Sequence, residues 1–410
     1  MSGRRLHTWL AVFVVAIGLL VTAVLAMFLY MFVTGPLHSD PDSLPSIARD
    51  KPSNEWLDAA GRGRQIMHDA LVEQNLPGLS VAVGVGGDIV WAEGFGWADL
   101  EKRVAVAPET RFPIGSASIA LTSAAVGLLL EQNKLALDRK VQTYAPEVPE
   151  KDWPVTVGQL MAHTAGVADD GGEQGPLFGK HCERPVDGLR ILAGFERQLR
   201  FTPGTQFLRT NYGWIIVSAA VEGAAGEPFT VFMQKQIFEP LGMGATIVAS
   251  TGEPRADRAT SYFPRFMAAP RYGAQPWDPQ DLSCFAGGGA FLSTPSDLVR
   301  FGMAVNSGRL LQPATVKLLQ TPQRLPSGQE TGYGLGWDVR NVTLAGTHTR
   351  WIGHEGTLSM GGNMASLITF PERGIAVAVT TNISYADTVS LAVRVAEAFA
   401  VSRPTGRPMR

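Results

Sequence analysis

This 410-residue sequence contains very little cysteine and has almost no net charge. Its two cysteines, Cys182 and Cys284, are too few for the disulfide framework of a small secreted protein, and their spacing does not match a metal site. The formal net charge is −2, because 35 Lys and Arg residues are interspersed with 37 Asp and Glu residues. No basic surface for nucleic acid is therefore predicted, and nothing in the pattern calls for a metal.

The two cysteines allow two interpretations. We expect two separate buried thiols, because free cysteine behaves as a small apolar side chain. A disulfide between Cys182 and Cys284 is the alternative if the chain folds in an oxidising compartment.

The sequence has enough apolar residues to form a large core. Apolar residues make up 45% of the chain and charged residues 18%, which is typical of a globular protein rather than a disordered one. One large domain, or two subdomains in close contact, fits this length.

A long apolar segment near the N-terminus predicts a transmembrane helix. Residues 10–33 contain no charge, and about 20 residues are enough to cross a bilayer. Arg4 and Arg5 precede the segment, so residues 1–9 are predicted to be cytoplasmic and the rest of the chain extracytoplasmic. A cleavable signal peptide is the competing interpretation, but its apolar core is usually only about 7–15 residues long. We favour an uncleaved signal anchor.

The residues after this segment divide into three parts. Residues 34–60 are rich in Pro, Ser and Asp and are predicted to form an extended linker. A globular domain is predicted over 61–402, followed by a short tail over 403–410. We expect the domain to face the periplasm, and a mitochondrial location is the alternative.

Strand patterns occur at both ends of the globular part. Apolar runs flank turn residues at 79–95 and at 364–382, which predicts two hairpins, and helical spacing occurs at 61–78 and 385–401. The stretch between them has helical patterns, including 118–137 and 210–226, interrupted by loops rich in Gly and Pro. This order predicts an α/β fold in which both chain ends build one sheet and a mainly helical subdomain is inserted.

Several motifs appear in the order in which one enzyme family presents them. They are FPIGSASIALTSAAV, VTVGQLMAHTAGV, FTPGTQFLRTNYGW, GGGAFLSTPSDLVRFG, YGLGW and GHEG. From about Gly61 onward the chain resembles serine β-lactamases and penicillin-binding proteins, especially class C-like β-lactamases, related esterases, D-aminopeptidases and a mitochondrial β-lactamase-like protein. The resemblance implies an antiparallel sheet flanked by helices, a helical subdomain, an active-site groove between them, and no cofactor.

The first family motif has lost its base. The family attacks an acyl carbonyl with the serine of Ser-x-x-Lys, and the lysine helps to remove the proton from the hydroxyl. Here the resemblance places Ser116 at the nucleophile position and Ile119 at the lysine position. A hydrocarbon side chain cannot accept a proton. None of the eight lysines has a serine three residues before it, so the alignment cannot be shifted to restore the motif.

The second motif has lost its tyrosine. In the family, Tyr-x-Asn supplies a phenol that transfers the proton, and here the matching residues are Arg209, Thr210 and Asn211. A guanidinium, with a pKa above about 12, is not a general base near neutral pH. Arg209 can still bind a carboxylate or a phosphate.

The third motif is retained as His354, Glu355 and Gly356. The resemblance implies that the backbone N–H groups of Ser116 and Thr357 surround the oxyanion. His354 is the best surviving base, because the ordinary pKa of histidine is about 6.5.

Each of these residues also has a purely structural interpretation. Ser116 suits a helix N-terminus without any chemistry, His354 can be a structural histidine, and Arg209 can lie on a solvated surface. His163 matches a family position that is usually structural, and we assign it no catalytic role.

Three functions fit the sequence. The first is a degenerate serine hydrolase, inactive or weakly active, whose groove binds an anionic peptide, a cell-wall fragment or another acyl compound. The second is an active esterase, peptidase or β-lactamase in which His354 activates Ser116. The third is a membrane-tethered scaffold that assembles with itself or with envelope proteins.

Overall fold

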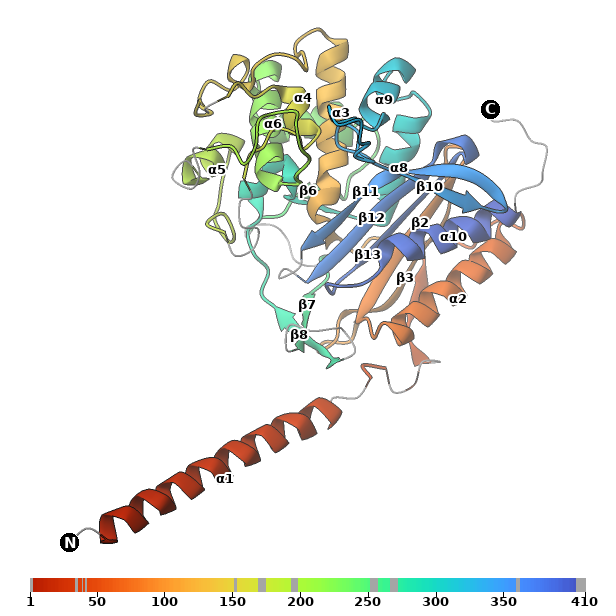
Figure 1. Ribbon diagram of the computed structural model, residues 1–410. Coiled ribbons are helices and arrows are strands. Elements are labelled where there is room, and N and C mark those ends of the chain that lie inside the picture. Colours follow the sequence, from red (N-terminus) through yellow and green to blue (C-terminus); the bar gives the residue numbers. More distant parts are fainter. Residues whose placement is uncertain are drawn as a thin grey trace.

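The computed structural model describes residues 3–33, 36–38, 40, 43–150, 153–168, 175–192, 198–250, 257–265, 272–358 and 362–402. One helix, α1 (Gly3–Val33), precedes a globular domain (Figure 1). Its segment Trp9–Tyr30 has a mean hydropathy of 2.9 and is not buried, so its length and composition suit a membrane span. The predicted tail over 403–410 lies outside the described residues.

Within the described residues, the main sheet has eight strands and combines both ends of the chain. The strand order is β1-β3-β2-β13-β12-β11-β10, β4 pairs with β3, and all pairings are antiparallel. The strands are β1 (Ser46–Ala48), β2 (Gly78–Val85), β3 (Asp88–Asp99), β4 (Val104–Ala105), β10 (Asp338–Leu344), β11 (Thr347–Leu358), β12 (Asn363–Phe370) and β13 (Ile375–Thr381). The prediction of one sheet built from both ends is confirmed.

Helices cover both faces of this sheet (Figure 1). On one face, α2 (Leu57–Glu73) and α10 (Thr388–Ser402) pack against each other and on the strands. On the other, α8 (Pro295–Asn306) packs on β2, β12 and β13. Adjacent residues of β2 therefore enter different cores: Val81 belongs to the cluster with α2 and α10, and Ala82 belongs to the cluster with α8.

A mainly helical subdomain is inserted between β4 and β10, as predicted (Figure 1). Its helices are α3 (Ser118–Glu131), α4 (Val157–Met161), α5 (Pro185–Leu192), α6 (Asn211–Ala225), α7 (Phe229–Met233) and α9 (Pro313–Gln320). The small strands are β5 (Phe112–Pro113), β6 (Ile247–Val248), β7 (Ser261–Pro264), β8 (Ala274–Trp277) and β9 (Phe291–Ser293). Helices α3 and α6 are almost completely buried and pack against each other, which fixes the start of both helices beside the sheet.

The predicted extended linker over 34–60 needs correction, because parts of it pack on the domain. Strand β1 pairs with the edge strand β3, and α2 begins at Leu57 rather than at 61. His38 is buried, with its Nε2 2.6 Å from the carbonyl oxygen of Leu76. These contacts hold the domain close to the end of α1.

The expectation of two separate thiols is wrong. Cys182 and Cys284 form a disulfide across 102 residues of sequence, with their Cα atoms 4.8 Å apart. It links the segment before α5 to the buried turn beside α6, a proximity that only the tertiary fold creates. A disulfide is typical of proteins that fold in an oxidising compartment.

Candidate functional site

Ser116 lies in a tight turn between β5 and α3. Gly115 has a φ of +48°, in the left-handed region, and starts the short 3₁₀ helix Gly115–Ala117 that leads into α3. A Cβ atom on Gly115 would lie only 3.0 to 3.2 Å from backbone atoms of Thr357. The half-buried Ser116 is therefore held directly beside β11.

Gly356 makes this contact possible from the side of the strand. A Cβ atom at this position would lie 1.8 Å from the carbonyl oxygen of Ile114 and 2.6 Å from the backbone nitrogen of Ala117. Only glycine allows β11 to approach the Ser116 turn so closely. The structure thus brings the predicted residues Ser116, Gly356 and Thr357 together.

The Ser116 hydroxyl donates a hydrogen bond to an amide. Its Oγ lies 3.1 Å from Oδ1 of Asn211, the first residue of α6. The Thr210 side chain caps this helix by accepting a hydrogen bond from the backbone N–H of Tyr212. A neutral amide oxygen can orient a hydroxyl but cannot take its proton.

Ile119 occupies the first turn of α3, three residues after Ser116. Residues three apart share one face of a helix, so position 119 is where a side chain can reach towards the serine. Ile119 is only 2% exposed and belongs to the apolar core around α3 and α6. The position that could carry a base has become part of the core.

Arg209 is paired with a buried carboxylate. Its guanidinium forms an ion pair with Asp338, whose side chain is 4% exposed, and lies 4.8 Å from the ring centroid of Tyr333. Arg340 approaches the same Asp338 carboxylate at 3.3 Å. Two guanidiniums share one carboxylate, which leaves this group with a net charge of +1, and both arginine side chains are partly exposed.

His354 is buried on β11, and each of its ring nitrogens has a partner. Nδ1 lies 2.5 Å from the carbonyl oxygen of Glu355, and Nε2 lies 3.0 Å from the Tyr333 hydroxyl. A carbonyl oxygen can only accept, so Nδ1 carries the hydrogen and Nε2 accepts from Tyr333. Burial, together with the positive charge of Arg209 and against the opposing effect of Asp338, lowers the pKa of His354 to about 4.

His163 supports the same side-chain cluster beside the start of α6. Its Nδ1 accepts a hydrogen bond from the backbone N–H of Thr210 at 3.3 Å, and its ring centroid is 4.9 Å from that of Tyr333. Burial, with a smaller contribution from the charge of Arg209, holds the pKa of His163 well below its ordinary value. These contacts are those of a structural histidine that positions Thr210.

Three residues of this cluster were missed from the sequence: Tyr333, Asp338 and Arg340. Tyr333 is fully buried, and burial holds its pKa well above the ordinary value, so the phenol stays protonated and donates to His354. The motif YGLGW contained the signal, because it begins with Tyr333 and ends immediately before Asp338.

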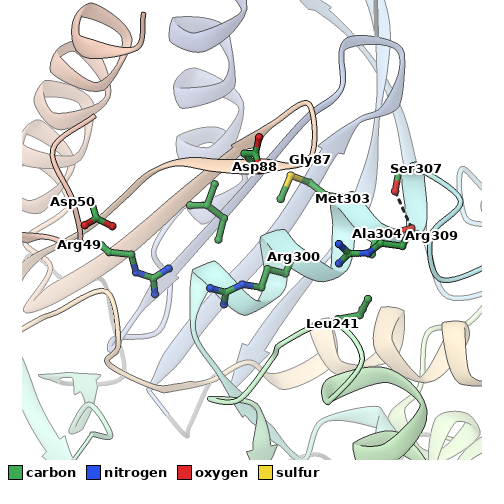
Figure 2. Close-up of a pocket in the computed structure, with 11 residues that line it drawn as sticks. Arg49, Asp50, Gly87, Asp88, Leu241, Arg300, Met303, Ala304, Ser307 and Arg309 are labelled. Carbon is green, nitrogen blue, oxygen red and sulfur yellow. Dashed lines mark hydrogen bonds between the residues drawn. The ribbon is translucent and has the colours of Figure 1, made fainter. Parts of the chain in front are cut away.

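A cavity of about 380 Å³ lies away from these residues, between α8 and the turn that joins β2 to β3. Figure 2 shows Arg49 and Arg300 extending towards each other across it. Both arginines are already in ion pairs, Arg49 with Glu109 and Arg300 with Asp297. None of the predicted site residues lines this cavity.

A comparison with family models decides the identity of the domain. The model described as beta-lactamase matches residues 63–400.

The chain belongs to the beta-lactamase family. It is similar to the mitochondrial serine beta-lactamase-like protein LACTB of Bos taurus, with 28% identity over an alignment that covers 83% of this chain and 79% of that protein. Two solved structures have the same fold. The octameric penicillin-binding protein homologue from Pyrococcus abyssi matches with a TM-score of 0.68 and 24% identity, covering 82% of this chain and 76% of that one. The D-amino acid amidase of Ochrobactrum anthropi SV3 matches with a TM-score of 0.70 and 22% identity, covering 84% and 100%.

In the terms of this family, the chain is a beta-lactamase-like serine hydrolase domain preceded by an apolar helix. The serine position, the asparagine of the second motif and the glycine of the third lie together, as the family resemblance implies. The two positions that carry proton-accepting groups in the family hold Ile119 and Arg209 instead.

Proposed function

We propose that this chain is a binding protein derived from a serine hydrolase, with Ser116 unreactive or only weakly reactive. One observation carries the proposal: the Ser116 hydroxyl donates to the amide oxygen of Asn211, which is not a base. A serine hydroxyl is a poor nucleophile unless a neighbouring group takes its proton. Ile119 offers no such group, and Arg209 is a permanent cation.

The hydrogen bonds of His354 argue against the alternative in which it activates Ser116. Its Nε2 lone pair already accepts the Tyr333 hydroxyl, so it is not available to a second donor. A group with a pKa of about 4 is also a weak base for a serine hydroxyl. Activation by His354 would therefore require the Tyr333 contact to break first.

The charge of the Arg209 cluster favours an anionic ligand. Arg209 and Arg340 share one carboxylate and keep a net charge of +1 at partly exposed positions. By the family resemblance, the backbone N–H groups of Ser116 and Thr357 would bind a carbonyl oxygen of this ligand. We infer that the ligand is an acylated peptide or a similar acyl compound that carries a carboxylate.

The N-terminal helix and the disulfide support a membrane-tethered domain on an oxidising side of the membrane. With Arg4 and Arg5 before the apolar segment of α1, the proposed orientation has a cytoplasmic N-terminus and a domain in the periplasm. LACTB is named as a mitochondrial protein, which keeps a mitochondrial location as the alternative. Self-assembly stays a separate prediction, in line with the octameric homologue of the same fold.

A pair of N-acetyl dipeptides tests the proposed binding. The dipeptide with a free carboxylate is expected to bind the wild type about tenfold more tightly than its C-terminal amide, because a hydrogen bond to a charged group contributes about 1.5–3 kcal/mol. Isothermal titration calorimetry measures both affinities. Ser116→Ala should bind as the wild type does, and Arg340→Gln should lose the preference for the carboxylate.

Arg350→Gln is the matched control, because Arg350 lies on the same hairpin but pairs with the exposed Glu372. It should keep the full preference for the carboxylate. Equal affinities for the acid and the amide in the wild type would contradict an anion-binding groove.

A further inference from the structure

A cavity of about 350 Å³ lies on the side of the domain that is next to the C-terminal end of α1. It is formed by the end of β3 and the turn after it, by β7 and β8, and by the segment that follows α1. Its lining residues include Leu37, Trp97, Glu101, Arg103, Tyr262 and Arg265. None of them belongs to the Ser116 site.

This cavity is next to the apolar helix. Leu37 comes four residues after Val33, the end of α1, and four residues span at most about 14 Å. The guanidinium of Arg265 lies 5.3 Å from the ring centroid of Tyr30, in the last turns of α1. Figure 1 also shows β7 and β8 on the side of the domain that faces the end of α1. If α1 spans a bilayer, the cavity lies at the membrane surface.

Two arginines of this cavity have no carboxylate partner within the part of the chain that the structure describes. Among the described residues, neither Arg103 nor Arg265 forms an ion pair, whereas the adjacent Lys102 is paired with Asp99. The guanidinium of Arg103 lies 5.2 Å from the ring centroid of Trp97, and its backbone has a φ of +54° in the turn after β3. With Glu101 counted, the lining carries a net charge of +1.

The chemistry of the lining matches one kind of ligand found at a membrane surface. Guanidinium groups bind phosphate oxygens through pairs of parallel N–H donors. The Glu101 carboxylate can accept hydrogen bonds from headgroup hydroxyls, and Leu37 and Leu100 supply apolar contact next to the acyl-chain region. Basic pockets beside membrane-spanning helices suit anionic headgroups for the same reasons.

We propose that this cavity binds the phosphate of an anionic phospholipid headgroup through Arg103 and Arg265. The phospholipid belongs to the leaflet on the same side of the membrane as the globular domain. Headgroup binding holds the domain against the membrane surface in a fixed orientation, in addition to the covalent connection through residues 34–36. This inference rests on the membrane tether proposed above.

Native mass spectrometry of the full-length chain, released from nanodiscs of phosphatidylglycerol, tests the cavity. The wild type is expected to retain one phospholipid per chain, and Arg103→Gln/Arg265→Gln is expected to reduce this retained fraction about tenfold, because both cationic contacts are lost. Arg324→Gln/Arg350→Gln is the matched control, since these exposed arginines pair with Glu330 and Glu372. It should retain the lipid as the wild type does.

Four outcomes would overturn the proposal. The first is equal lipid retention in the two double variants, both shown to be folded by their thermal unfolding. The second is saturation of the wild type by inorganic phosphate in lipid-free detergent at the same affinity, which would indicate a site for soluble anions. The third is failure of the wild type to float with phosphatidylglycerol vesicles, which would remove the tether itself. A chain that floats but retains no lipid would refute the cavity alone.

Discussion

The variant Ile119→Lys/Arg209→Tyr is expected to react with a fluorophosphonate at Ser116 about 10²–10⁴ times faster than the wild type, which is the usual contribution of a positioned general base. The fold already holds Ser116 beside β11 and Asn211, and on the proposed account only the proton acceptors are missing. The change at position 119 restores an amine three residues from the serine, and the change at position 209 restores the phenol. Intact-protein mass spectrometry over time gives the labelling rate.

Ile119→Met/Arg209→Phe is the matched control for this variant, because it has similar bulk and no amine or phenol. It should label as slowly as the wild type, and adding Ser116→Ala to the reactive variant should abolish labelling. Both double variants leave Asp338 paired with Arg340 alone, so thermal unfolding must show that each is folded. A folded Ile119→Lys/Arg209→Tyr protein that labels no faster than the control would mean that the groove is not competent for acylation.

Acidification is expected to destabilise the wild type by about 3 kcal/mol between pH 7 and pH 4 through His354. The pKa of His354 is lowered from 6.5 in the unfolded chain to about 4 in the fold, chiefly by burial. The unfolded state therefore binds more protons in this range, and stability falls as the pH drops from about 6.5 to 4. His163, whose pKa is also held below its ordinary value by burial, changes stability in the same direction.

Urea denaturation at a series of pH values measures this dependence. His354→Gln should make the curve shallower between pH 6.5 and 4 and leave the His163 contribution, because an amide does not titrate and can still accept the Tyr333 hydrogen bond. The exposed His348, whose ring contacts Thr343, provides the control, and the pH dependence that His354→Gln removes should still be present in His348→Gln. A wild-type stability that is the same at pH 7 and pH 4 would contradict the burial of a neutral His354.

An isoleucine in place of the family lysine at position 119 also affects the stability of the fold. A buried cation requires compensation for its lost hydration, and its exchange for a well-packed apolar side chain is often neutral or stabilising. Ile119 is 2% exposed within the core around α3 and α6. The same residue thus removes the base and adds an apolar side chain to the core at the start of α3.

Local patterns in the sequence were sufficient to predict most of the fold. The hairpins β2–β3 and β12–β13 and the helices α3 and α6 follow from apolar spacing and turn residues within short windows. The family motifs then predicted that Ser116, Asn211 and Gly356 lie close together, as they do in the structure. Each of these predictions depends only on the type of a residue and on the residues near it in the sequence.

What the sequence did not reveal depends on contacts between distant segments. Arg209 and Asp338 are 129 residues apart, and Cys182 and Cys284 are separated by 102. The pairing of β1 with β3 involves a segment whose Pro, Ser and Asp content predicts a linker. No periodicity encodes such pairs, so the ion pair, the disulfide and the edge strand appear only in the tertiary structure.

Stoichiometric labelling of the wild-type protein at neutral pH tests most directly whether Ser116 lacks an activating base. The chain is incubated with excess fluorophosphonate beside Ser116→Ala, and intact mass and peptide mapping locate any adduct. We predict no adduct on Ser116 above the level of the Ser116→Ala control. One adduct per chain, located on Ser116 and absent from the Ser116→Ala protein, would show that another group takes the proton and that the site is an active hydrolase centre.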